Sequence, residues 1–339
     1  MACSSASQAT AQAGAPSRRH APAAAWRRWR GWPWVRRIAI AVFLGVVVLL
    51  LANQARAIAW GEVLAAMRAY PWQVLALAAG FAALSHLLYA TFDLIGRHYT
   101  GHALRTGPVM AITFVSYAFN LNMGTLVGAV GMRARLYARL GLDAPAIARI
   151  VGSSMLTNWL GYCLLAGLAF LLWPLAMPED WHLGRIAQRV LGAALIAVAA
   201  AYLLACAFSP RREWRVRGHE IALPSLRVAL VQLALSCANW SAMGAAMAVL
   251  LQGAVPYPMA LGVLLIGAVA GLLSRVPAGL GVLEAVFVAL LAPPLTQAGI
   301  IAAVLCYRAM YYWLPLGVAA LLYLGMEANA RRLAVAAPR

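Results

Sequence analysis

A carboxylate and a guanidinium occur in parts of this chain where charges are rare. Glu284 comes just after the stretch SRVPAGLG (274–281), and Arg308 lies ten residues into an apolar run that begins at residue 298. If that run crosses a membrane, Arg308 lies about 15 Å deep at 1.5 Å per residue. Inserting an arginine at that depth costs ~2.5–3.5 kcal/mol, so we expect it to face the protein interior and to have a partner. That partner is either Glu284, in an ion pair, or a lipid phosphate, which a guanidinium binds bidentately.

The stretch before Glu284 predicts a break in a helix. Pro277, Gly279 and Gly281 interrupt an otherwise apolar run, and backbone that leaves helical form inside a membrane must be buried in protein or face water. The helix after the break presents free N–H groups, which suit a phosphate. Glu284 lies in its first turn, where it either caps the helix or serves as a partner for a cationic group or a protonation switch. We therefore assign these four residues to a candidate site for a lipid headgroup.

Further polar residues lie within the apolar segments or at their ends. The basic segment RARLYARLGL (133–142) either anchors a loop or gathers anionic headgroups. Asp93 and Arg97 are spaced as an i,i+4 ion pair. Polar stripes at helical spacing predict hydrogen bonds between helices or contacts with a substrate. The stripes are His86, Tyr89, Asp93 and Arg97; Gln232, Ser236 and Asn239; and Ser154 with Asn158. The candidate headgroup site also includes Arg133, Arg135, Arg139, Asn120, Asn122, Asn158 and Tyr311.

The composition predicts an all-α, polytopic membrane protein. Hydrophobic residues make up 64% of the chain and charged residues 11%, whereas soluble domains carry about 25% charged residues. Apolar runs of membrane-spanning length recur, and we expect about six to eight spans plus two broken hairpins. The predicted spans lie near residues 38–53, 72–95, 150–173, 187–208, 226–251 and 298–324. The predicted domains are a disordered basic tail (1–37), a membrane domain (38–325) and a C-terminal tail (326–339).

The distribution of arginine orients these spans. Seven arginines precede the first span and three follow the last, which places both termini in the cytoplasm by the positive-inside rule. Arginines also flank the apolar region 108–131 on both sides, so this region must enter and leave the membrane on the same face. Asn120, Asn122 and Gly124 lie in its middle, where the chain would turn. We predict a re-entrant hairpin from the cytoplasmic face.

The apolar region 259–292 must also enter and leave the membrane on one face, in this case the opposite one. Two full crossings need about 40 residues, but this region has 34 and contains the break at 277–281. We expect a deep hairpin from the periplasmic face, with two short crossings as the alternative. One hairpin from each face is what inverted repeats with broken helices produce. That architecture is typical of transporters that bind a substrate near the membrane midplane.

Several classes of function find no support in the sequence. All 27 basic residues are arginine and they cluster at the ends of apolar segments, which does not indicate a nucleic-acid partner. The five cysteines stand singly, without a CxxC pair, so we expect neither disulfides nor a zinc site. No GxSxG, HExxH or P-loop motif occurs. We therefore expect no enzymatic activity, no metal and no cofactor.

Two stretches are similar to a known family. SYAFNLNMGTLVGAVGMRARLYARLGL (116–142) and RVPAGLGVLEAVFVALL (275–291) resemble the two signature stretches of the lysylphosphatidylglycerol synthase membrane-domain family, including its stand-alone, YbhN-like branch of inner-membrane proteins. In the two-domain synthases this membrane part is implicated in moving the lipid product across the membrane. Those synthases also carry a soluble transferase domain, whereas only residues 325–339 follow the last predicted span, so aminoacyl transfer is not expected. The family's second motif usually reads closer to PGGLG, so Ala278 replaces a glycine here.

Two hypotheses of different classes follow. The first is a translocator of an anionic phospholipid (phosphatidylglycerol, cardiolipin or a derivative) in the bacterial inner membrane. In it, Arg133, Arg135 and Arg139 collect headgroups at the cytoplasmic face. The broken helix and Arg308 then bind phosphate, and Glu284 gates the path or balances charge. The second is an accessory membrane protein that holds lipid for a partner phospholipid synthase without moving it.

The predicted topology can be tested by chemical labelling. Single cysteines introduced at Ala138 and Ala144 in a cysteine-free background should react only with a reagent supplied from the cytoplasm, because both follow the cytoplasmic hairpin. Labelling of both positions from the periplasm would contradict the hairpin and the orientation of every later span.

Overall fold

A computed structural model describes residues 59–178, 184–210, 213–216, 219–274, 276–292 and 295–336 of the chain. The predicted basic tail and the predicted span near 38–53 lie outside these residues, as does Arg275. In the described part, six helical segments are long and apolar enough to cross a membrane. The all-α, multi-span prediction is confirmed.

Five of these six segments lie close to predicted spans, whereas the sixth, Tyr257–Ser274, belongs to the predicted second hairpin. Their bounds are α3 (Trp72–Ala90) with α4 (Phe92–Thr100), α7 (Ala144–Leu172), α8 (Arg185–Phe208), α9 (Leu226–Leu250), α10 (Tyr257–Ser274), and α12 (Gln297–Arg308) continued by the π-helical segment η5 (Ala309–Trp313) and by α13 (Leu314–Ala336). The short helix α2 (Trp60–Arg68) precedes them and packs against α12. Helix α13 continues past residue 325, where the sequence predicted the start of a tail.

Small residues allow the long helices to approach each other closely. A Cβ atom added to Gly161 of α7 would lie 2.3 Å from the Ser236 hydroxyl of α9. Gly167 of α7 and Gly192 of α8 also lie close together, since a Cβ atom added to either would lie within 2.8 Å of the other's carbonyl oxygen. Close packing of this kind is how membrane helices associate, because lipid offers no hydrophobic driving force between them. The same helices exchange polar contacts, since Gln232 donates to the Thr157 hydroxyl over 2.9 Å.

The first predicted hairpin is confirmed. Helix α5 (Thr106–Met123) ends at Gly124, whose φ of 84° lies in a region that favours glycine. The chain then returns through the π-helical segment η2 (Leu126–Met132) and α6 (Arg133–Arg139), packed against α5. A Cβ atom on Gly128 would lie 2.0 Å from the Asn120 backbone nitrogen, so the two arms touch through their backbones. The face from which this hairpin enters the membrane stays a prediction.

The second predicted hairpin is also confirmed, and its arms differ in length. Helix α10 has 18 residues, whereas α11 (Val282–Leu291) has 10, which is about 15 Å of helix and too short to cross a bilayer. Gly267 and Gly271, the GxxxG of α10, pack within the chain against Leu283 and Gly279. The hairpin therefore returns only part of the way, and the alternative of two short crossings is not supported, because α11 is too short to cross.

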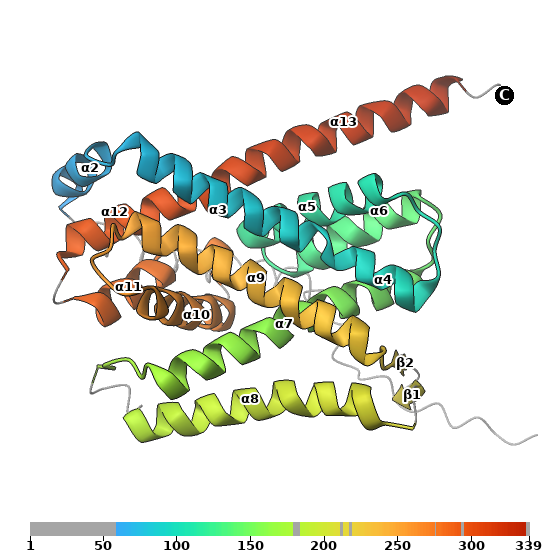
Figure 1. Cartoon of the computed structure of the whole chain (residues 1–339). Helices are drawn as coiled ribbons and strands as arrows, with labels where there is room; N and C mark the ends of the chain where they lie inside the picture. Colours follow the sequence, from blue (N-terminus) through green and yellow to red (C-terminus); the bar gives the residue numbers. More distant parts are fainter. Residues whose placement is uncertain are drawn as a thin grey trace, which may run out of the picture. The chain divides into compact units, whose positions relative to one another are not determined.

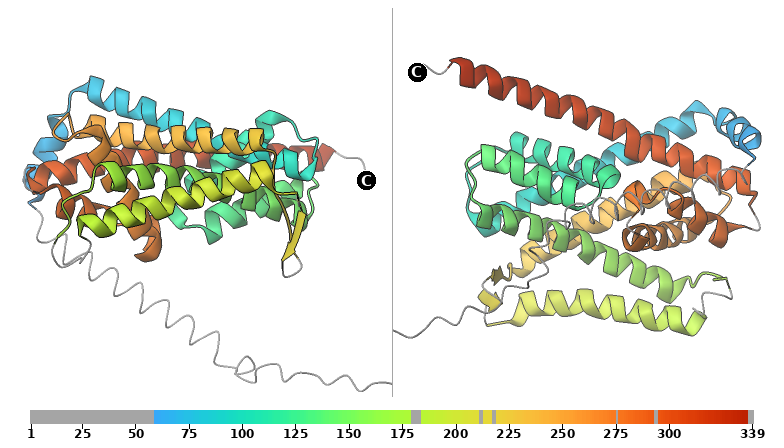
Figure 2. Two further views of the ribbon diagram at one scale, coloured as in Figure 1. Left: turned by 60° about the horizontal axis from the view of Figure 1, so that its bottom comes forward. Right: turned by 180° about the vertical axis from the view of Figure 1, so that it is seen from behind.

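The two hairpins lie toward opposite ends of the long helices α3 and α9. Figures 1 and 2 show α5 and α6 beside one end of this pair and α10 and α11 beside the other. Helix α13 covers the first hairpin, with Ala319 and Tyr323 packed on its apolar side chains. This placement of the two hairpins agrees with the inverted repeats that the sequence predicted.

One element was not predicted. Strands β1 (Glu213–Val216) and β2 (His219–Ala222) form an antiparallel hairpin in the arginine-rich loop between α8 and α9. Alternating apolar residues such as Trp214, Val216 and Ile221 fit a short strand pair, but arginine counting alone treats this loop only as a topology signal.

The close approach at Gly128 predicts a strong effect of a single methyl group. Gly128→Ala should lower the free energy of unfolding by about 3 kcal/mol or more, because the new methyl group overlaps backbone that cannot rotate away. Gly107→Ala on the other arm is the matched control, since no heavy atom lies within 4 Å of its Cβ position. Thermal unfolding in detergent should show a large loss for the first variant and little change for the second. Equal stability of the two variants would mean that the arms are not in backbone contact.

Candidate functional site

Arg308 lies beneath the break in the second hairpin and is almost completely buried. Its Nε and Nη2 donate to the two carboxylate oxygens of Glu284, over 2.5 and 3.0 Å. Its Nη1 donates to the carbonyl oxygen of Ala278, and Nη2 donates to that of Gly279, both over 2.8 Å. Each guanidinium nitrogen therefore has a partner in this state. The predicted ion pair with Glu284 is confirmed. A phosphate could bind this guanidinium only by displacing one of these partners.

The break presents carbonyl oxygens to the arginine because its backbone is left-handed. Ala278 (φ 56°), Gly279 (φ 57°) and Gly281 (φ 78°) all have positive φ. For alanine this conformation costs roughly 1–2 kcal/mol, and such strain persists only where the surroundings fix it. The short turn Pro277–Gly279 thus supplies hydrogen-bond acceptors to Arg308. The sequence predicted N–H donors on the following helix but not these carbonyl acceptors.

Glu284 is the part of this site that is open to its surroundings. The α11 helix begins after Gly281 without any side-chain cap, so Glu284 does not act as the helix cap. Its side chain is 16% exposed, compared with 1% for Arg308. The carboxylate is therefore the more accessible member of the ion pair.

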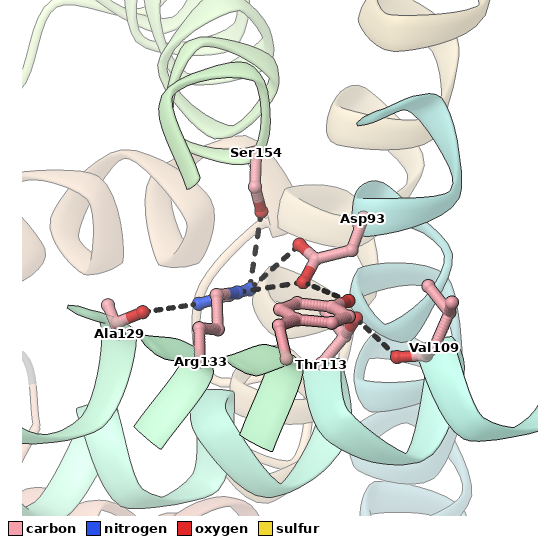
Figure 3. A network of polar contacts seen from close by, with 7 residues as sticks. Asp93, Val109, Thr113, Ala129, Arg133 and Ser154 are labelled. Carbon is pink, nitrogen blue, oxygen red and sulfur yellow. Dashed lines mark hydrogen bonds and ion pairs between the residues drawn. The ribbon is translucent and has the colours of Figure 1, made fainter. Parts of the chain in front are cut away.

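A second buried arginine pair secures the first hairpin. Figure 3 shows Arg133 of α6 between Asp93 of α4 and Ser154 of α7. Its Nε and Nη2 donate to the Asp93 carboxylate over 2.8 and 3.1 Å, and Nη1 donates to the Ala129 carbonyl of η2 over 3.2 Å. The Tyr137 hydroxyl donates to the same carboxylate over 2.9 Å. Arg133 and Asp93 are 1% and 0% exposed, so this pair is closed on all sides.

This network corrects two predictions. Asp93 does not pair with Arg97, which instead donates to the Thr106 hydroxyl over 3.1 Å and to the Leu104 carbonyl in the loop after α4. Asp93 points into the core, where Arg133 and Tyr137 donate to it, and Arg97 lies near the end of α4. Arg133 does not collect headgroups from a surface either, because its side chain is enclosed by α4, η2 and α7.

The other two arginines of the basic segment do lie at a surface. Arg135 and Arg139 are 53% and 40% exposed, and both approach Glu327 of α13. Arg139 binds this carboxylate through two hydrogen bonds of 2.5 and 3.0 Å, whereas Arg135 lies 3.6 Å from it. Two cations share one carboxylate, so positive charge remains available at this surface.

The predicted asparagines hold the scaffold rather than a common site. The Asn122 amide donates to the Ala118 carbonyl and, over 3.2 Å, to the Tyr312 carbonyl, which ties the first hairpin to η5. Asn120 contributes its backbone where Gly128 crosses it. The backbone carbonyl of Asn158 accepts hydrogen bonds from the side chains of Ser236 and Trp240 in α9.

Buried aromatic residues connect the two arginine pairs. The Tyr311 hydroxyl lies 2.9 Å from that of Tyr117, and the Tyr117 ring stacks on Tyr89 at 3.6 Å between centroids. Tyr89 lies 6.0 Å from the Arg133 guanidinium. At the other end, the ring of Tyr312, the residue next to Tyr311, lies 5.4 Å from the guanidinium of Arg308. A contiguous line of rings therefore runs from one buried arginine to the other.

Sequence reasoning missed part of this line. The Ser85 hydroxyl joins it by donating to Asn239 over 2.7 Å and by lying 2.7 Å from the Tyr311 hydroxyl. Tyr117 lies one residue from an interior face of α5, and Tyr307 lies one turn before Tyr311. Helical spacing could have identified Tyr307, which lies four residues before the predicted site residue Tyr311.

Comparisons with known proteins agree with this architecture. The family model described as "Lysylphosphatidylglycerol synthase TM region" matches residues 37–319. The chain is 43% identical over 303 residues to "Inner membrane protein YbhN" of Escherichia coli (strain K12), covering 89% of this chain and 95% of that protein. It is 30% identical over 265 residues to "Uncharacterized protein slr0712" of Synechocystis sp., covering 77% and 82% of the two chains. The chain therefore belongs to the lysylphosphatidylglycerol synthase transmembrane-region family.

Proposed function

We propose that this membrane protein translocates anionic phospholipids across a bacterial inner membrane, the location given in the name of its Escherichia coli relative. The observation that carries the proposal is the arrangement at the break. There a buried arginine is neutralised by a partly exposed carboxylate and donates to two carbonyl oxygens of a strained turn. No chemical reaction is part of the proposed activity.

The geometry supports an exchange of one anion for another. A guanidinium binds carboxylate and phosphate through the same fork of parallel N–H donors. A lipid phosphate that reaches Glu284 can therefore take its place on Arg308 while the arginine stays neutralised. Arg308, the more deeply buried member of the pair, is therefore never left unpaired, which would cost about 3–5 kcal/mol. The charge that is released from the pair is that of Glu284, the partly exposed member. Release of Glu284 also frees the strained turn, which favours movement of the break.

The exposed arginines supply a route to this site. Arg135 and Arg139 lie on the second arm of the first hairpin and, within the described part of the chain, share the Glu327 carboxylate. In the proposed topology they face the cytoplasm, where they attract the anionic headgroups of that leaflet. The closed pair of Asp93 and Arg133 holds this arm in place and takes no direct part in lipid movement.

A double-mutant cycle at the break tests the exchange. Glu284→Gln and Arg308→Gln should each destabilise the fold by about 3–5 kcal/mol, because each leaves one buried charge unpaired. The double variant should be much more stable than the sum of the single effects predicts. In vesicles with labelled phosphatidylglycerol, however, all three variants should move no lipid. Thermal unfolding in detergent and lipid movement are measured on the same preparations.

The pair Asp93→Asn with Arg133→Gln is the matched control. It removes another buried bidentate pair, and this double variant should recover stability and still move lipid. Lipid movement by the Glu284→Gln, Arg308→Gln double variant would contradict the exchange, as would equal loss of movement in both double variants. A wild-type protein that binds lipid but never moves it would support the accessory role for a partner synthase instead.

A further inference from the structure

Four buried side chains form a cluster on the line between the two arginine pairs. We call His86 of α3, Tyr117 of α5, Tyr307 of α12 and Tyr311 of η5 the histidine–tyrosine cluster. The rings of His86 and Tyr307 both contact that of Tyr311, at 4.7 and 5.1 Å between centroids. His86 also lies 5.2 Å from the ring of Tyr117. Neither the ion pairs nor the proposed phosphate exchange assigns a role to this cluster.

Two polar atoms of the cluster have no hydrogen-bond partner among the described residues. They are Nε2 of His86 and the hydroxyl of Tyr307, whose side chains are 3% and 1% exposed. Nδ1 of His86 lies 2.9 Å from the Ala82 carbonyl and donates to it, so Nε2 of the neutral ring is an acceptor. The Tyr307 hydroxyl both donates and accepts. Buried polar groups nearly always have partners, so two such atoms beside one ring indicate a site that a ligand completes.

The charges around the cluster define what that ligand is. Its own groups are phenols and an imidazole, and the flanking side chains of Ser85 and Asn239 are neutral. The two carboxylates inside the helical core of the described chain, Asp93 and Glu284, are both held by arginine. An ammonium headgroup would find no free counter-ion here, whereas an alcohol would find one acceptor and one donor.

We infer that the histidine–tyrosine cluster is a recognition site for the uncharged hydroxyl groups of an anionic lipid headgroup, as in phosphatidylglycerol. The inference rests on the proposed function, because the phosphate of the same lipid lies on Arg308, the neighbour of Tyr307 in the chain. The headgroup alcohol donates to Nε2 of His86 and exchanges a hydrogen bond with the Tyr307 hydroxyl. A lipid that carries the phosphate alone leaves both atoms unpaired. An ammonium group could donate to both atoms, but its charge would have no free carboxylate beside it.

The test measures binding separately from transport. The full-length protein in detergent is mixed with phosphatidylglycerol, phosphatidic acid or phosphatidylethanolamine, and dissociation constants are taken from the rise in melting temperature. We expect the wild type to bind phosphatidylglycerol about tenfold more tightly than phosphatidic acid, because two neutral hydrogen bonds are gained. Tyr307→Phe removes only the unpartnered hydroxyl. It should leave the melting temperature without lipid unchanged or higher and reduce the preference about threefold.

Tyr162→Phe is the matched control, since its hydroxyl donates to the Leu265 carbonyl over 3.1 Å and its ring packs against Trp159 and Trp240. This variant should melt at a lower temperature and keep the full preference for phosphatidylglycerol. An unchanged preference in Tyr307→Phe, equal weakening of all three lipids, or a clear loss of stability without lipid would each overturn the inference. Failure of the wild type to move lipid in vesicles, with the binding preference intact, would overturn the proposed transport and leave the recognition site standing.

Discussion

An arginine side chain inside a membrane protein has to be surrounded by acceptors, and this requirement governs the arrangement of both hairpins. A regular helix has no carbonyl oxygens to spare, because each is bonded to an N–H four residues later. The turn at Ala278 and Gly279 leaves two carbonyls free, and both bind Arg308. The π-helical segment before Arg133 has the same effect on a smaller scale, since the Ala129 carbonyl binds that arginine. The carbonyl groups left free by the irregular backbone therefore pair with the N–H groups of the buried arginines.

The two hairpins carry opposite members of their ion pairs. In the first, the returning arm provides the arginine and the preceding helix α4 provides Asp93. In the second, the returning arm provides Glu284 and the following helix α12 provides the arginine. The pairs also differ in access, because Asp93 is enclosed whereas Glu284 is partly open. One hairpin is thus fixed to the scaffold, and the other holds the contact that an anion can replace. This asymmetry is the basis for placing lipid exchange at the second hairpin.

Much of this arrangement could be predicted from the sequence. The depth of Arg308 in its apolar run required a buried partner, and Glu284 was the available carboxylate. Arginine counting required both hairpins, since any other path puts several arginines on the wrong face. The partner of Asp93 could not be found in this way, because spacing along one helix does not show which face packs inward. The prediction that Arg133 lies at the surface was wrong for the same reason, because a basic segment alone does not show which of its arginines is buried. The carbonyls at the break depend on the φ angle of Ala278, which residue type alone does not predict.

The central claim is that the break must move for lipid to pass, and it can be tested by locking the break in place. A Cβ atom on Gly271 would lie 3.8 Å from the Gly279 Cα, and one on Gly279 would lie 3.5 Å from the Gly271 Cα, which suits a disulfide between cysteines at the two positions. Phosphatidylglycerol movement is measured in vesicles with this double-cysteine variant in a cysteine-free background, before and after reduction. The account predicts no lipid movement in the oxidised protein and recovery on reduction. Equal movement in the oxidised and reduced protein would contradict it.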